Sequence, residues 1–236
     1  MRILMVSDVY FPRVNGVSTS IETFRRTLAA LGVELRLVAP RYGAEPDEPG
    51  VVRVPGWPVP GDREDRLVGW RAMHRAVLAA AEGCDLVHIQ TPFVAHYAGL
   101  AAARRLGLPV IATYHTLFEE YLQHYAPWLP AGWLKRRARG LSRRQCNALD
   151  GVIVPSTAMR ERLLGYGVGV PLHVLRRASR SIASGAATGR PSGPATASRR
   201  SVLWRSSSAG WPTRRTSASC SMHSSMRCAS DRTCCC

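Results

Sequence analysis

The side chains best placed for chemistry follow a short apolar run near the start of the chain. Ser7 and Asp8 come directly after this run, and the following loop ends in Asn15 and Gly16, before apolar residues recur at helical spacing. A glycine lets the backbone approach a ligand closely, and a helix start offers unpaired amides and the positive end of its dipole to an anion such as a diphosphate. A glycine that only turns the chain into the helix explains the same spacing, so both interpretations stay open.

Two further apolar runs, 86–89 and 110–113, also end in polar and aromatic residues. The first is followed by Gln90 and Phe93, and the second by Tyr114 and His115. A functional histidine is one interpretation of His115, although a satisfied histidine at a strand end is the better explanation from the residues alone. His88, inside the first run, is expected to be packed or hydrogen-bonded.

The spacing of apolar residues predicts strands that alternate with helices. Strands are expected at 3–6, 33–39, 51–54, 86–89, 110–113, 152–154 and 172–174, and helices at about 18–31, 65–81, 94–106, 132–147 and 157–164. Ser18, Thr19 or Ser20 is expected to cap the first helix, and a Pro/Gly turn is expected at 55–61. This alternation indicates an α/β fold with a Rossmann-like, doubly wound parallel sheet. In such sheets ligands gather beyond the carboxyl ends of the strands.

The predicted helix at 132–147 is strongly basic and carries Trp133. Its basic residues include Lys135, Arg136, Arg139 and Arg143. Basic side chains beside an aromatic anchor suit the headgroups of anionic lipids, so a membrane contact is one interpretation. A solvated basic face is the commoner explanation of such a charge run and stays open.

Residues 176–236 differ sharply in composition from the rest of the chain. They hold 15 of the 20 serines, 11 arginines against one acidic residue, and five of the seven cysteines. Such a segment buries too little apolar surface to offset its ordering entropy, so a disordered tail is expected after a domain at 1–175. Trp204, Trp211 and the terminal cysteines favour a reading-frame error after Leu175, with a genuine disordered extension as the alternative.

Charge and cysteine content limit the remaining function classes. The net charge of +16 divides into +6 for residues 1–175 and +10 for the tail, and Lys135 is the single lysine, so no nucleic-acid partner is expected. Cys84 and Cys146 lack metal-ligand spacing, and His96 and His124 add no ligand pattern, so no metal site is assigned. Without a signal peptide or membrane-spanning run, a cytoplasmic location is expected, with peripheral attachment to the inner face of the cell membrane left open.

Four motifs occur in order along the predicted domain. They are Ser-Asp-Val-Tyr-Phe-Pro-Arg-Val-Asn-Gly-Val at 7–17, His-Ile-Gln-Thr-Pro-Phe at 88–93, Thr-Tyr-His-Thr at 113–116, and Val-Pro-Ser-Thr-Ala-Met at 154–159. Together they resemble the N-terminal half of the retaining glycosyltransferases of family 4, which have the GT-B fold. The resemblance covers residues 1–175 and points to the subgroup that glycosylates diacylglycerol or phosphatidylinositol-type lipids.

The resemblance implies roles for several of these residues. Gly16, with Asn15 beside it, matches the glycine whose amide meets the donor diphosphate. His115 matches an active-site histidine near the reacting sugar and acceptor. The acceptor pocket is implied to be shaped by Gln90, Phe93 and Tyr114.

The resemblance also implies a reaction. A hexose passes from a nucleotide diphosphate sugar to a lipid or glycan hydroxyl with retention, without a metal cofactor and without a protein nucleophile, so Asp8 is expected to be structural or to orient substrate. The nucleotide-binding half has no in-frame counterpart after Leu175. Re-reading the tail codons from their third base allows Pro-Thr-Gly-Ile and Glu-Lys-Asn peptides similar to the continuation of the family. The chain as written is therefore expected to be truncated and inactive.

Three other function classes are weighed against this one. A nicotinamide-dependent oxidoreductase would share the fold, but its glycine triplet does not follow the first strand; the cluster of Gly165, Gly167 and Gly169 follows a helix instead. A nucleic-acid-binding module would have to use the arginine-rich tail, which has no recognised motif. A non-catalytic lipid- or protein-binding half domain stays open as the alternative.

Overall fold

The computed structural model describes residues 1–59, 62–115 and 130–176, and all of them belong to one compact unit, Met1–Ser181. The strands are β1 (Arg2–Val6), β2 (Glu34–Arg41), β3 (Val51–Val59), β4 (Asp62–Val68), β5 (Leu86–Ile89), β6 (Val110–Thr113), β7 (Gly151–Val154) and β8 (Leu172–Val174). The helices are α1 (Gly16–Ala30), α2 (Trp70–Ala81), α3 (Val94–Leu106), α5 (Ala131–Asn147) and α6 (Thr157–Gly165). The disorder expected for the tail falls on residues outside those described.

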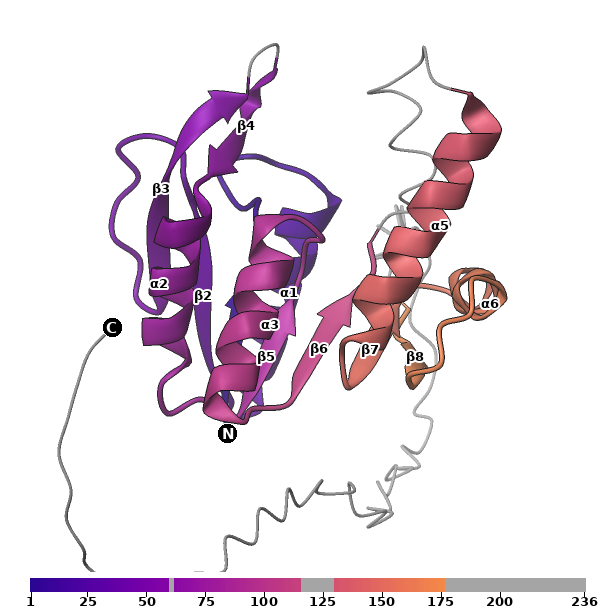
Figure 1. The fold of residues 1–236 in the computed structure, drawn as a ribbon. Coiled ribbons are helices and arrows are strands. Elements are labelled where there is room, and N and C mark those ends of the chain that lie inside the picture. The colour runs from indigo at the N-terminus through magenta and orange to yellow at the C-terminus, as the bar shows by residue number, and fades with distance from the viewer. Residues whose placement is uncertain (60–61, 116–129, 177–236) are drawn as a thin grey trace, which may run out of the picture. The chain divides into compact units, whose positions relative to one another are not determined.

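The strands of the described residues form one eight-stranded sheet in the order β4-β3-β2-β1-β5-β6-β7-β8 (Figure 1). All neighbouring pairs in it are parallel except β3 and β4, which are antiparallel. The chain winds outward from β1 in both directions, so the predicted doubly wound α/β fold is confirmed. Strand order reverses between β1 and β5, which makes the carboxyl ends of these two strands the place where such sheets bind ligands.

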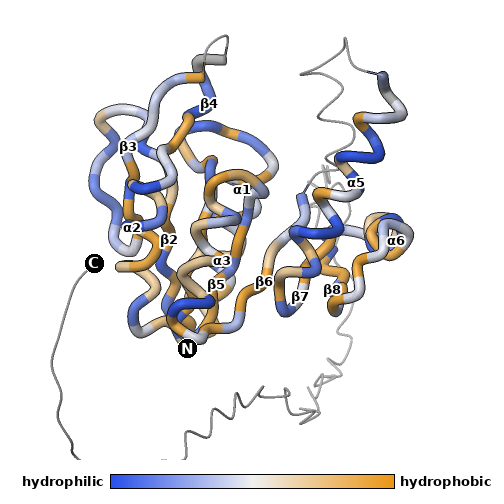
Figure 2. Tube along the Cα trace, viewed as in Figure 1, coloured by the Kyte–Doolittle hydropathy of each residue, from blue (hydrophilic) through white to orange (hydrophobic). Residues whose placement is uncertain are grey.

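The central strands β1, β2 and β5 are largely buried on both faces, as their apolar residues require. Leu4 and Val6 of β1 belong to a large core cluster with residues of α2, α3, α5 and α6. Met5, between them, belongs to a smaller cluster with Ile21 of α1 and Leu37 of β2. Successive side chains of a strand point to opposite faces, so α1 covers one face and the other helices cover the opposite one. Figure 2 shows hydrophobic stretches along strands of the sheet and more hydrophilic stretches along α5.

The turn predicted at 55–61 and the helix start predicted at Asp65 are wrong. Instead β3 runs to Val59 and pairs with β4 in an antiparallel hairpin, and α2 begins at Trp70. Prolines are tolerated in strands at edges and bulges, and the register of this hairpin shifts between Pro58 and Val59. The charged residues of β4 are typical of an edge strand that must not pair further, so the usual apolar alternation is missing there.

Candidate functional site

The first helix begins two residues earlier than the sequence predicted. Asn15, rather than Ser18, Thr19 or Ser20, is the N-cap of α1, and its side-chain oxygen accepts a hydrogen bond from the backbone N–H of Ser18 at 2.8 Å. The next two amides, those of Gly16 and Val17, have no intrahelical acceptor because they precede the first complete turn. Gly16 is exposed. The helix therefore presents amides and its positive dipole end at the edge where sheets of this kind bind ligands.

Asp8 joins the loop after β1 to the loop after β5. Its Oδ2 accepts a hydrogen bond from the Thr91 hydroxyl at 2.8 Å, and its backbone N–H donates to Thr91 Oγ1 at 2.7 Å. Both carboxylate oxygens also lie within hydrogen-bonding distance of the Ala95 N–H, in the first turn of α3. Burial raises the pKa of Asp8 to about 6 although these donors act to lower it. The structure thus gives Asp8 a structural role, as a cap of α3 and a clamp across the strand reversal.

A pair of hydrogen bonds links the carboxyl ends of β5 and β6. His88 Nε2 lies 2.7 Å from Thr113 Oγ1, and His115 Nε2 lies 2.9 Å from Gln90 Oε1. His88 is buried, and its ring packs edge-on against Phe24 of α1. Burial, with a smaller contribution from His115, lowers the pKa of His88 to about 3, so the ring stays neutral at ordinary pH. The prediction that His88 is packed and hydrogen-bonded is confirmed.

The three residues expected at the acceptor pocket lie in different environments. Phe93 is 53% exposed and forms the N-cap of α3. The Tyr114 hydroxyl lies 2.9 Å from Ser142 Oγ of α5, which ties the end of β6 to that helix. Gln90 is only 1% exposed and contacts His115. Gln90 therefore lies in the interior next to His115, whereas Phe93 lies on the surface.

The loop between β1 and α1 is held by residues that the sequence did not single out. The Tyr10 hydroxyl donates to Glu22 at 3.0 Å and accepts from Arg25 at 2.6 Å, both on α1. Arg53 of β3 donates to the carbonyl of Phe11 at 2.8 Å and lies over the Tyr10 ring. An aromatic residue in a loop followed by charges at helical spacing is too common a pattern to predict this clamp. These contacts fix the path by which the chain reaches Gly16.

The helix α5 has one buried and one basic face. Its buried residues include Leu134, Ala138, Ser142, Gln145 and Cys146. The opposite face exposes Lys135, Arg136, Arg137, Arg139, Arg143 and Arg144. Trp133, half exposed, lies under the Arg137 guanidinium at 5.1 Å.

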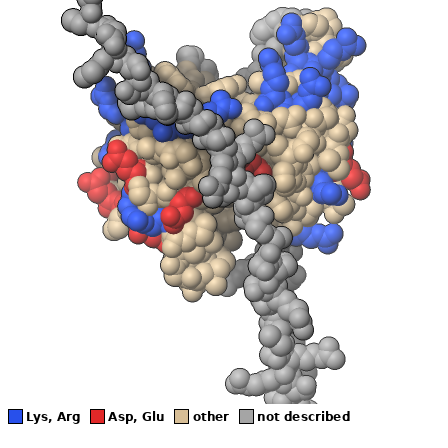
Figure 3. Space-filling view, turned by 60° about the horizontal axis from the view of Figure 1, so that its bottom comes forward, with Lys and Arg blue, Asp and Glu red and all other residues tan. Residues whose placement is uncertain are grey.

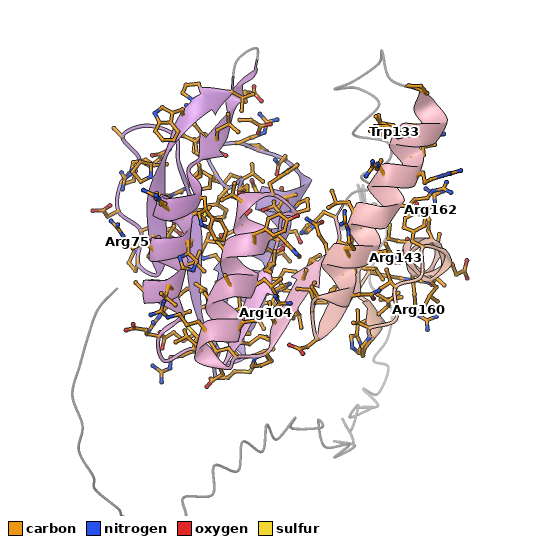
Figure 4. All side chains as sticks on the ribbon, viewed as in Figure 1. Arg75, Arg104, Trp133, Arg143, Arg160 and Arg162 are labelled. Atoms are coloured by element: carbon orange, nitrogen blue, oxygen red, sulfur yellow. The ribbon has the colours of Figure 1, made fainter. Side chains whose placement is uncertain are left out.

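The basic face of α5 continues onto α6. The Arg139 guanidinium lies 5.5 Å from the ring of Tyr166, which ends α6. Figure 4 shows Trp133 and Arg143 on α5, with Arg160 and Arg162 on the neighbouring helix α6.

The comparisons with known proteins agree with this geometry. The family model described as Glycosyltransferase Family 4 matches residues 14–178, a stretch that includes Asn15, Gly16 and His115. The chain belongs to glycosyltransferase family 4.

Two curated relatives show how much of such a protein this family 4 chain represents. An alpha-monoglucosyldiacylglycerol synthase of Streptococcus pneumoniae is 34% identical over 74% of this chain and 40% of its own length. A GDP-mannose-dependent alpha-mannosyltransferase of Mycobacterium tuberculosis is 30% identical over 71% of this chain and 45% of its own length. The chain thus spans less than half the length of these relatives.

A solved structure confirms the fold of this family 4 chain. A sucrose-phosphate synthase structure from Thermosynechococcus elongatus, 13% identical, superimposes with a TM-score of 0.50 over 77% of this chain and 91% of that one. The identity is too low to say more than that the two share the Rossmann-like half of the GT-B fold.

The described residues show neither a metal-binding cluster nor a membrane-spanning helix. Across 1–59, 62–115 and 130–176, no group of three or more His, Cys, Asp or Glu side chains is placed to hold a metal ion. In the same ranges no helix is long and apolar enough to cross a membrane.

The buried ring of His88 predicts a pH-dependent stability. The unfolded chain gains a proton near pH 6.5 that the folded His88, with a pKa of about 3, does not bind, so stability should fall as the pH drops from about 6.5 towards 3. The variant His88→Gln should show a smaller fall between pH 7 and pH 5 in urea unfolding. Burial also lowers the pKa of His96, to about 4. His96 therefore contributes to the loss of stability at low pH in wild type and in the variant alike.

The matched control is His173→Gln, which removes an exposed ring on β8 and should keep the wild-type dependence. If stability fell equally between pH 7 and pH 5 in wild type and in His88→Gln, the prediction would be wrong. His88 would then take up its proton without loss of the fold.

Proposed function

We propose that residues 1–176 form the acceptor-side half of an enzyme that transfers a hexose from a nucleotide diphosphate sugar to a lipid hydroxyl, with retention at the anomeric carbon. The observation that carries the proposal is the family 4 match over residues 14–178, which covers the α1 N-terminus and His115 at the carboxyl edge of the sheet. The names of two relatives support the substrates, since one forms a glucosyl diacylglycerol product and another uses GDP-mannose.

The α1 N-terminus suits the departing diphosphate. In the proposed reaction the bond from the anomeric carbon to the diphosphate oxygen breaks, a bond to the acceptor hydroxyl oxygen forms, and the hydroxyl proton leaves with the diphosphate. Negative charge grows on the diphosphate, and preorganised donors lower the energy of that state. Asn15 occupies only the Ser18 amide, which leaves those of Gly16 and Val17 for such an anion.

His115 is proposed to contact the reacting sugar and the acceptor hydroxyl. It follows β6 at the ligand-binding edge and is held by Gln90, and Phe93 and Tyr114 are proposed to line the acceptor side. Asp8 is poorly suited to attack the sugar because both its oxygens are engaged with Thr91 and the start of α3. That arrangement supports retention without a protein nucleophile, and no metal is required for it.

The basic face of α5 is proposed to rest on an anionic membrane and bring the half domain to its lipid acceptor. Figure 3 shows a group of basic side chains at the upper right with no acidic side chain among them. Four residues at the centre of the proposed contact are Lys135, Arg136, Arg139 and Arg143, all exposed. The half-exposed Trp133 provides an amphipathic ring of the kind that sits at lipid headgroups. A non-catalytic lipid-binding role of this half domain is the second candidate, favoured by the same surface.

The full chain is expected to show no hexosyl transfer by itself. The match covers less than half of the length of its curated relatives, and we place the nucleotide-binding residues in the rest. Purified chain, incubated with several nucleotide sugars and a lipid extract, should release no nucleoside diphosphate above a heat-treated control. Robust turnover would contradict the assignment of this chain to one half of the enzyme.

Resequencing the coding DNA from Leu175 to Cys236 complements the assay. A single-base change that restores Pro-Thr-Gly-Ile and Glu-Lys-Asn would supply a two-domain gene whose product should be active. An intact frame as written would favour the non-catalytic lipid-binding role.

Replacing the four central basic residues of α5 should weaken membrane binding selectively. Each basic residue near an anionic surface contributes about 1 kcal/mol, so the combined variant Lys135→Gln, Arg136→Gln, Arg139→Gln and Arg143→Gln should bind phosphatidylserine vesicles at least about tenfold more weakly in co-sedimentation. The tail remains in all proteins, so its charge is constant.

The matched control removes four exposed arginines from α2 and α3, namely Arg71, Arg75, Arg104 and Arg105. It lowers the net charge equally and should bind nearly as wild type. Equal weakening by both variants would show that net charge, and not the face of α5, determines binding.

A further inference from the structure

The two hydrogen bonds between β5 and β6 form a regular ladder. His88 pairs with Thr113 and Gln90 pairs with His115, and each pair is separated by 25 residues in sequence. In the parallel register His88 lies opposite Ile111 and Ile89 opposite Ala112. Residues two apart on a strand point to the same face, so His88 and Gln90 lie on one face together with Thr113 and His115. Of these two hydrogen bonds, the one between Gln90 and His115 lies nearer to the carboxyl ends of the strands.

The hydrogen bond between Gln90 and His115 determines which ring nitrogen of His115 carries the hydrogen. Gln90 Oε1 is an amide carbonyl oxygen and can only accept, so at 2.9 Å the Nε2 atom of His115 must donate. In the neutral ring the lone pair is then on Nδ1. Because Nε2 faces the buried Gln90, the Nδ1 side of the ring turns away from it. Loss of this acceptor would remove the contact that favours the Nε2–H tautomer over the Nδ1–H tautomer.

Gln90 is itself held in place on both sides. Its backbone N–H donates to the Val6 carbonyl at 2.9 Å, which extends the pairing of β5 with β1. The next residue, Thr91, exchanges two hydrogen bonds with Asp8. The side chain is 1% exposed, so its amide has little freedom to turn away from His115.

The amide of Gln90 is retained at a cost to stability. Its Nε2 is buried and has no hydrogen-bond partner among the described residues. A buried donor left unsatisfied is unfavourable, and an apolar side chain of the same shape would avoid that penalty. An amide at this position is therefore explained by what its oxygen does for His115.

We propose that Gln90 is a positioning residue that locks His115 in the Nε2–H tautomer and fixes the orientation of its ring at the carboxyl edge of the sheet. The tautomer lock rests on the geometry alone, and its catalytic use rests on the proposed function. Gln90 acts through His115 and does not itself need to touch the substrate. This extends the acceptor-pocket role expected for Gln90 from the sequence.

The test is the tautomer of His115 in the full chain. Two-bond ¹H–¹⁵N correlation spectra of protein labelled with ¹⁵N-histidine should show the Nε2–H pattern for His115, assigned by its loss in His115→Gln. In Gln90→Met, which has a similar shape and no acceptor, the ratio of Nε2–H to Nδ1–H should fall about tenfold, which corresponds to the loss of one ordinary hydrogen bond. In Gln90→Glu the carboxylate keeps an acceptor oxygen, so Nε2 should remain protonated.

Gln145→Met provides the matched control. Gln145 is also buried and bonds the Pro92 carbonyl at 2.8 Å, close to the same loop, and its replacement should leave the His115 tautomer unchanged. A wild-type Nδ1–H pattern, or an unchanged Nε2–H pattern in Gln90→Met, would overturn the proposal. The wild-type spectrum decides even if a variant fails to fold. Failure of the proposed function would instead appear in transfer assays and would leave these spectra as expected.

Discussion

The clamp between Asp8, Thr91 and the first turn of α3 is the interaction on which the site depends. It joins the loops after β1 and β5, the two strands that diverge where the order of the sheet reverses. Without a bridge, two loops at such a crevice could separate, and the groups that they carry would lose their relative positions. Burying the carboxyl is unfavourable, as its raised pKa shows, and the donors from Thr91 and α3 offset part of that cost.

The residues of the proposed site are connected to this clamp along the chain, on one side from Asp8 and on the other from Thr91. Between Asp8 and Asn15 the chain is held at Tyr10 by contacts with α1 and β3. Asn15 then caps α1, whose first amides have no intrahelical acceptor. In the other direction it leaves Thr91, whose neighbour Gln90 supports His115. An anion at α1 and a hydroxyl near His115 would therefore be presented by loops that share one rigid connection. Precise relative placement of reacting groups is what such an arrangement provides.

The sequence predicted most of the scaffold because its interior strands are short, apolar and bounded by turn residues. The run at 86–89 and the helix at 94–106 coincide with β5 and α3. It missed the β3–β4 hairpin because Pro55, Pro58 and the charges of β4 contradict ordinary strand patterns, and tertiary pairing overrides them. It also misplaced the cap of α1, since Asn15 and the nearby serines are all good caps and only the structure selects one.

The site itself was predictable as a set of positions but not as a set of contacts. The sequence placed Gln90 and His115 directly after or near the ends of two apolar runs, yet the bond between them needs the register of β5 against β6. Likewise, the position of Asp8 after β1 does not reveal that α3 begins beside it. Such contacts depend on which strands become neighbours, and that is a property of the whole sheet.

The central claim is that the carboxyl edge of β1, β5 and β6 binds the acceptor. Amide spectra of ¹⁵N-labelled full chain, recorded in neutral detergent micelles with and without a diacylglycerol, test it most directly. We expect saturable shifts at Phe93, Tyr114 and His115 that appear only with the diacylglycerol, whereas α5 should respond equally to both kinds of micelle. Shifts that are the same in empty and loaded micelles, or that leave this edge unaffected, would contradict it.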